Sequence, residues 1–184
     1  MSVKVGMVSL GCSKNQVDAE RLLAQIEKGG YEICTDASQC DVVIINTCGF
    51  IEDAKRESIE TILEFAQLKT GGALRALVVT GCLAERYREQ VAAEIPEADV
   101  VLGIGCNADI LGAIERALHG EKTVAFGEKE ALSLEGERVL ANEPYFAYLK
   151  VAEGCDNRCS YCAIPLIRGP FRSRPMENIV AEAQ

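Results

Sequence analysis

Short aliphatic runs alternate with amphipathic stretches along residues 1–120 of the 184-residue chain. This alternation is typical of βα units, in which parallel strands form a sheet and the intervening helices cover it. The expected strands are the aliphatic runs at 3–10, 41–46, 77–80 and 100–102. The sequence therefore predicts an α/β fold with a parallel sheet flanked by helices.

The stretches between these runs carry the signals of helices. Ser13 and Gln16 have the spacing of a capping box, and Gly29 stops the helical pattern that follows them. Asn107 is expected to cap the helix after the last strand. The second helix is expected to bury one apolar stripe, made of Ile59, Ile62, Leu63 and Ala66.

The pattern changes after residue 120. Residues 121–143 lose the helical period and carry six Glu among short apolar runs, which predicts a hairpin or a connector at a domain boundary. From Pro144 a second domain is expected over 144–184, with an apolar strand at 145–151, a cysteine-rich loop, and a helix with Pro175 at its N1 position. One βα unit cannot bury both of its faces, so we expect this second domain to be truncated.

The charge balance restricts the partners. Lys and Arg number 19 against 28 Asp and Glu, and the net charge of -9 is opposite to the positive surface that binds nucleic acid. An acidic surface suits a basic protein partner, and it equally suits a soluble acidic protein without one. No apolar run reaches the roughly 20 residues of a membrane helix and no export signal is visible, so we expect a cytoplasmic protein with no membrane partner.

The nine cysteines are the most informative part of the composition, because a disulfide framework is not expected in a reducing compartment. Cys155, Cys159 and Cys162 form a CxxxCxxC pattern in a polar loop after an expected strand. Three thiolates at this spacing can bind three irons of one 4Fe–4S cluster and leave the fourth iron open to a small molecule. The main alternative is a zinc knuckle, although structural zinc sites usually need a second CxxC pair, which does not follow in the sequence.

A second group of cysteines follows the expected strands. Cys12, Cys48 and Cys82 each come directly after one, and the carboxyl ends of parallel strands share one edge of a sheet. Adjacent glycines let the backbone turn tightly near a bulky cofactor: Gly11, Gly49 and Gly81. Cys106 also follows a strand, so position alone does not select three ligands from these four thiols.

Two further features of the sequence can be explained without a functional role. Arg168, Arg172 and Arg174 lie in a segment with no acidic residue, where they either meet a substrate or cofactor carboxylate or form a solvated basic surface. His119 stands alone at a helix end and offers no acid/base pair, so we expect it at the surface.

The CxxxCxxC pattern, with Tyr161 just before its third cysteine, resembles the signature of the radical S-adenosylmethionine enzymes. Together with SLGCSKNQVDAE, NTCGFI, VTGCLAER and EGCDNRCSYCAIPLIRGPFRSRP, it makes nearly the whole chain resemble the methylthiotransferases of that superfamily. The resemblance implies a methylthiotransferase amino-terminal cluster domain at 1–120 and the first βα unit of a TIM-like partial barrel at 144–184.

The resemblance also implies the site residues. Cys12, Cys48 and Cys82 would hold one 4Fe–4S cluster. The second 4Fe–4S cluster would bind S-adenosylmethionine, with Tyr161 as a contact of that cofactor, and would be held by Cys155, Cys159 and Cys162. The remaining cysteines match no ligand position and are expected to be small buried hydrophobic residues: Cys34, Cys40 and Cys106.

Within the family, SLGC followed by KN, NTCGFI and YLKVAEGC resemble the branch that modifies an aspartate of protein twelve of the small ribosomal subunit, although Ser13 replaces the proline expected there. The implied reaction is methylthiolation of the aspartate β-carbon, with S-adenosylmethionine as methyl and radical source. Its implied partners are a ribosomal protein substrate and a reducing electron donor, and this part of the chain does not support an RNA contact. The alternatives are a transfer-RNA adenosine methylthiotransferase and a non-enzymatic iron–sulfur carrier or electron-transfer module. The 184-residue chain by itself is expected to be inactive.

Overall fold

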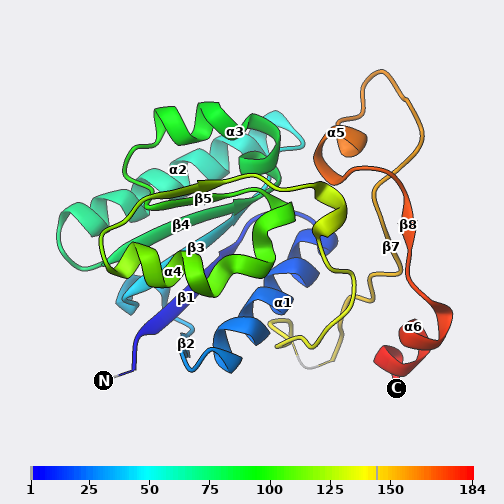
Figure 1. Ribbon diagram of the computed structural model, residues 1–184, viewed down its shortest axis with the longest axis horizontal. Helices are drawn as coiled ribbons and strands as arrows, with labels where there is room; N and C mark the ends of the chain where they lie inside the picture. The colour runs from blue at the N-terminus through cyan, green and yellow to red at the C-terminus, as the bar shows by residue number, and fades with distance from the viewer. Residues whose placement is uncertain (1, 144) are drawn as a thin grey trace.

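The computed structural model describes residues 2–143 and 145–184, and it places a six-stranded parallel sheet within the first of these ranges (Figure 1). The strand order is β2-β1-β3-β4-β5-β6. The strands are β1 (Lys4–Ser9), β2 (Glu32–Cys34), β3 (Val42–Thr47), β4 (Ala76–Gly81), β5 (Val100–Leu102) and β6 (Thr123–Ala125). The predicted α/β class, with a parallel sheet flanked by helices, is confirmed.

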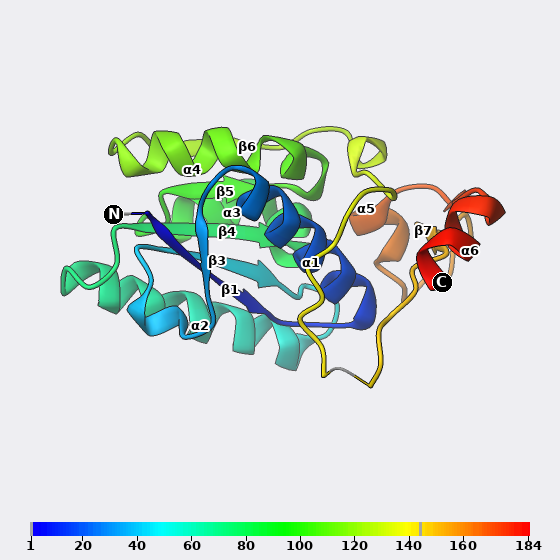
Figure 2. The same cartoon turned by 90° about the horizontal axis from the view of Figure 1, so that it is seen from below.

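Helices cover both faces of this sheet, and Figure 2 shows α4 and α2 on opposite sides of it. The helices are α1 (Ser13–Lys28), α2 (Glu52–Thr70), α3 (Cys82–Glu94) and α4 (Ile110–Leu118). Ile44 of β3 packs in the core with α1 and α4, whereas its neighbour Ile45 packs with α2 and α3. The central strands are apolar on both faces because helices bury both faces.

Three local predictions were wrong. Cys12, not Ser13, is the N-cap of α1, and Ser13 is the first helical residue. Asn107 caps no helix, because it lies in the short 3-10 helix η2 (Ile104–Asp109), where its side chain accepts a hydrogen bond from Thr80. On α2 the buried stripe is narrower than expected, and Ile59 and Leu63 are exposed.

Residues 121–143 contain the edge strand β6, which pairs in parallel with β5 instead of forming an antiparallel hairpin. The 3-10 helix η3 (Lys129–Ala131) follows it, as η1 (Ala37–Gln39) follows the other edge strand, β2. Both edge strands are three residues long, which is too short for a periodic signal.

The last part of the chain forms a small unit beside the sheet. Two short strands, β7 (Ala152–Glu153) and β8 (Arg172–Ser173), pair antiparallel, with α5 (Ile164–Arg168) between them and α6 (Met176–Ala183) after them. Pro175 is the N-cap of α6, not its N1 residue. The predicted start of this domain at Pro144 lies outside the described residues.

The strand predicted at 145–151 does not form. No partner strand pairs with these residues within the described ranges, and an unpaired segment cannot satisfy the backbone groups that a sheet would satisfy. Tyr145 and Phe146 are exposed there. In residues 2–143 and 145–184, no helix has the length and apolar character that crossing a membrane requires.

Candidate functional site

The carboxyl edge of the sheet brings together the ends of β1, β3 and β4. Ser9 is in register with Asn46, and Thr47 is in register with Gly81. Cys48 directly follows Thr47, and Cys82 directly follows Gly81 as the first residue of α3. Cys12, Cys48 and Cys82, here called the first trio, therefore meet at one edge.

Two glycines permit this approach. Gly81 has a φ of +93°, and a Cβ atom there would lie 2.5 Å from the Asn46 Oδ1 and 2.6 Å from the Thr47 nitrogen. Gly11 has a φ of +134°, and a Cβ atom there would lie 3.2 Å from the Cβ of Cys48. A side chain at either position would push apart the loops that carry the first trio.

Buried polar side chains hold these loops in place. The Asn15 amide donates hydrogen bonds to the carbonyl oxygens of Leu10 (2.9 Å), Asn46 (3.3 Å) and Thr47 (3.1 Å), and so joins the ends of β1 and β3. The Ser58 hydroxyl accepts a hydrogen bond from the Cys48 nitrogen (3.0 Å) and donates one to the Cys48 carbonyl (3.1 Å).

The three cysteines of the first trio differ in their exposure to solvent. Cys12 is exposed, Cys48 is half-buried and Cys82 is buried. Cys82 packs against Ala163 and Ile167 of the small unit. Burial raises the pKa of the Cys82 thiol, and the guanidinium of Arg168 acts in the opposite direction. Cys82 therefore lies on the side of the site that is buried in the protein, and Cys12 lies on the side that is open to solvent.

Cys155, Cys159 and Cys162, here called the second trio, lie on the loop between β7 and α5. The Cys155 nitrogen donates to the Gly169 carbonyl (3.1 Å), and the Cys162 nitrogen donates to the Cys159 carbonyl (3.1 Å). Cys159 is exposed, and Tyr161 is 88% exposed. Solvent therefore reaches much of this loop.

The other cysteines lie outside both trios. Cys106 is half-buried in η2, where it faces Gly127. Cys34 and Cys40 lie near each other, and each thiol donates a hydrogen bond to the Asp36 carbonyl (3.2 Å). Only Cys40 is fully buried as expected. His119 is exposed at the end of α4, as predicted.

Of the two alternatives for the arginine segment, the solvated basic surface is wrong for Arg168 and Arg174, which are both buried. Arg174 pairs with Glu135 (2.8 Å) and Glu182 (2.5 Å). Arg172 donates hydrogen bonds to the Glu130 (2.7 Å) and Leu132 (3.1 Å) carbonyl oxygens. These arginines bind groups of this chain.

Arg168 joins the small unit to the first trio. Its guanidinium contacts the carboxylates of Asp18 and Glu153, and it donates to the Cys82 Sγ at 3.1 Å and to the Asn15 Oδ1 at 3.0 Å. This group was not predicted from the sequence, and the available signal was the set of charged residues among the apolar positions that α1 buries: Asp18, Glu20 and Arg21.

The buried charges around Arg168 balance. Lys150 pairs with Asp18 (2.7 Å) and contacts Glu153, so two cations face two carboxylates. Burial alone would raise the pKa of Glu153, but Arg168 and Lys150 outweigh it and lower that pKa to about 2. The carboxylates also raise the pKa of Arg168 against the effect of burial. Glu153 and Arg168 therefore stay charged although both are buried.

The donor atoms of the two trios suit iron–sulfur clusters, because cysteine thiolates are the usual ligands of such clusters and each trio supplies three of them. No group of three or more His, Cys, Asp and Glu side chains in the described ranges is arranged around one ion position. In a cubane cluster each thiolate binds its own iron, so its ligands stand further apart. At the first trio the ends of β1, β3 and β4 bring three cysteines to one sheet edge. Apolar side chains shield Cys82, and a guanidinium N–H faces its sulfur, which suits a cluster.

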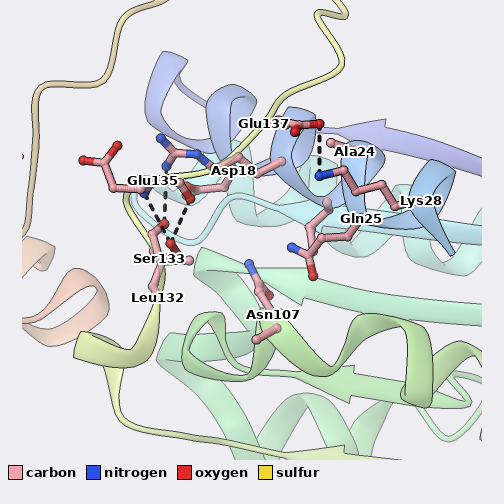
Figure 3. A pocket seen from close by; sticks show the side chains of 13 residues that line it. Asp18, Ala24, Gln25, Lys28, Asn107, Leu132, Ser133, Glu135 and Glu137 are labelled. Atoms are coloured by element: carbon pink, nitrogen blue, oxygen red, sulfur yellow. Dashed lines mark hydrogen bonds and ion pairs between the residues drawn. The ribbon is translucent and has the colours of Figure 1, made fainter. Parts of the chain in front are cut away.

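A separate cavity of about 300 Å³ lies between α1 and residues 132–137 (Figure 3). Arg21 crosses its wall and donates a hydrogen bond to the Ser133 carbonyl (3.3 Å), and Lys28 pairs with Glu137 (3.0 Å). No cysteine lines it. This cavity is therefore distinct from both trios.

Residues 4–103 match the family described as "Uncharacterized protein family UPF0004". A protein of Pelotomaculum thermopropionicum named ribosomal protein uS12 methylthiotransferase RimO is 52% identical over 185 residues, which cover 100% of this chain and 42% of that protein. Proteins of the same name from Geobacter sulfurreducens (50% identical; 98% of this chain, 41% of the relative) and Clostridium tetani (48% identical; 99% and 41%) are similar. The chain spans less than half the length of these relatives.

Proposed function

The chain belongs to the UPF0004 family, and we propose that it supplies both cluster sites of a radical S-adenosylmethionine methylthiotransferase that modifies ribosomal protein uS12. The observation that carries this proposal is the meeting of Cys12, Cys48 and Cys82 at one sheet edge, with the loop of the second trio attached to that edge through Arg168.

In this proposal the first trio holds one 4Fe–4S cluster and the second trio holds another, which also binds S-adenosylmethionine. When bound, these groups supply the radical chemistry, the sulfur and the methyl group that methylthiolation of an aspartate β-carbon needs. Tyr161, which directly precedes Cys162 in the sequence, is the proposed contact for S-adenosylmethionine.

The residues of the chain hold and shield these sites. Asn15 and Ser58 fix the loops that present the first trio, so its thiols are positioned before any ligand arrives. Ala163 and Ile167 exclude water from one side of Cys82. Such exclusion limits solvent access to a ligand of the proposed first cluster, which is one of the ways a protein controls the reduction potential of a metal site.

The substrate assignment rests on the relatives and on charge. The similar proteins are named for ribosomal protein uS12, and a net charge of -9 favours a basic protein over transfer RNA. A transfer-RNA adenosine methylthiotransferase is the alternative with the same chemistry, and a non-enzymatic iron–sulfur carrier or electron-transfer module is the alternative without it.

Product analysis tests all three functions. The full-length protein, reconstituted anaerobically, is incubated with reductant, S-adenosylmethionine and either uS12 or transfer RNA, and product masses are measured. We expect methylthiolated aspartate in uS12 and unmodified transfer RNA. A modified adenosine would support the first alternative, and bound clusters without S-adenosylmethionine cleavage would support the second.

A further inference from the structure

Arg168 follows the second trio in the chain but contacts the first. It is the last residue of α5, which packs beside the start of α3 (Figure 1). Its side chain is among the largest fully buried ones, and its Nη2 donates to the Cys82 Sγ at 3.1 Å. A cation that belongs in sequence to one site thus lies against a thiol of the other.

The direction of this contact is fixed by the other half of the guanidinium. Nη1 is held by the carboxylates of Asp18 and Glu153, and Lys150 binds the same two carboxylates from another side. Because the guanidinium is planar and its N–H groups form a rigid fork, Nη2 is directed at Cys82 and Asn15. A lysine ammonium could not make these contacts in one plane.

The need to compensate a buried charge explains the ion pairs of Arg168 with Asp18 and Glu153. It does not explain the contact of Arg168 with the Cys82 sulfur. Asp18 and Glu153 already compensate the buried cations. An N–H donor and a positive charge at a ligand sulfur have a separate effect on an iron–sulfur cluster, because both stabilise the additional negative charge of the reduced form. The reduction potential of the cluster therefore rises.

We propose that Arg168 is a positioning residue of the first trio, which raises the reduction potential of the cluster held there by donating a hydrogen bond to the Cys82 sulfur. The proposal rests on the proposed function, because it requires a cluster at the first trio. The small unit would then have two roles, because its loop carries the second trio and its helix α5 carries Arg168, which acts on the neighbouring cluster.

The test isolates one cluster. In the full-length protein, Cys155, Cys159 and Cys162 are changed to Ala, so that iron binds at the first trio alone. Arg168→Gln and Arg168→Lys are then added separately, and iron content and the EPR-monitored midpoint potential are measured for each protein. We expect about four irons per chain, a lower potential in Arg168→Gln, and a smaller decrease in Arg168→Lys, which keeps the charge.

Arg174→Gln is the matched control. Arg174 is also a buried arginine of the same segment and pairs with Glu135 and Glu182, but its contacts include no sulfur. Its removal should lower the free energy of unfolding and leave the potential unchanged.

The outcomes separate the two proposals. A parent protein without iron at the first trio would overturn the proposed function. Loaded Arg168 variants with the parent potential would overturn the inference alone. If Arg168→Gln loses its iron, the potential of Arg168→Lys decides in the same way. If both variants fold by circular dichroism but bind no iron while Arg174→Gln binds it, Arg168 is required to retain the cluster, and the inference that it adjusts the potential of a bound cluster is wrong. If neither folds while Arg174→Gln does, Arg168 serves the fold and the inference is wrong.

Discussion

The first trio comes from three separate strand–helix connections, whereas the second trio comes from one loop between β7 and α5. At the first trio the sheet register, buried hydrogen bonds and two glycines with positive φ determine where the thiols lie. At the second trio the positions of the thiols follow from their spacing along one loop, and Cys159 and Tyr161 are exposed. Substitutions far from the first trio should therefore damage it, while the second trio should respond mainly to changes in its own loop.

Removal of ligands should have the largest effect. Full-length protein should bind about eight irons per chain, and the triple change of Cys155, Cys159 and Cys162 to Ala should leave about four. Cys48→Ala should remove the other four irons and abolish methylthiolation, whereas Cys106→Ala should retain both clusters, because Cys106 faces Gly127 instead of the first trio. Iron analysis and product masses measure these effects.

Equal iron loss in Cys48→Ala and Cys106→Ala would show that the wrong thiol was chosen among those that follow the strands. A stoichiometric zinc that survives both sets of changes would contradict the assignment of two iron–sulfur clusters.

The next largest effect should come from the buried charges that support the first trio. Asp18→Asn leaves Arg168 and Lys150 with one carboxylate between them, and breaking a buried pair in this way costs about 3–5 kcal/mol. Denaturant unfolding measures the loss. Glu137→Gln is the control, because its pair with Lys28 is 75% and 62% exposed and should contribute less than about 1 kcal/mol. Similar losses in both variants would contradict a special role for the buried group.

The sequence predicted the parts of the first trio that follow a local pattern. The aliphatic runs located β1, β3, β4 and β5, and the sharing of one edge by parallel strands placed three cysteines together. It missed β2 and β6, since three residues carry no period. The strand predicted at 145–151 was wrong because apolar composition does not provide a partner strand.

The charged support of the first trio could not be predicted in the same way. Asp18 and Arg168 are separated by 150 residues, and neither belongs to a motif that requires the other. The basic segment around Arg168 was compatible with a solvated surface until the fold placed α5 against α3. Burial in three dimensions, not spacing, distinguishes Arg168 from an exposed arginine.

A smaller effect should come from the backbone beneath Cys82. At Gly81, where φ is +93°, the added side chain of Gly81→Ala would meet Asn46 and Thr47. At Gly120, where φ is +83°, a Cβ atom would have no neighbouring atom within 4 Å. A positive φ strains both variants, by about 1–3 kcal/mol at Gly81, whose ψ of −161° is almost restricted to glycine. Only Gly81→Ala should also lose iron from the first trio, because only there does the added side chain meet neighbouring atoms. Thermal unfolding and iron analysis of the two variants separate strain from displacement, and equal iron content would contradict the predicted dependence on backbone.

The smallest effect on stability should come from the second trio. Tyr161 is 88% exposed, so Tyr161→Ala should change the free energy of unfolding by less than about 0.5 kcal/mol. If its ring contacts S-adenosylmethionine, the same change should weaken binding of that cofactor to the reconstituted full-length protein, measured by equilibrium dialysis. Tyr145 is the matched control, because it is 80% exposed and lies outside the loop between β7 and α5 that carries the second trio. Tyr145→Ala should leave S-adenosylmethionine affinity unchanged. Equal affinity in both variants would remove Tyr161 from the cofactor site, whereas a large loss of stability in Tyr161→Ala would show that the loop of the second trio depends on the fold as much as the first trio does.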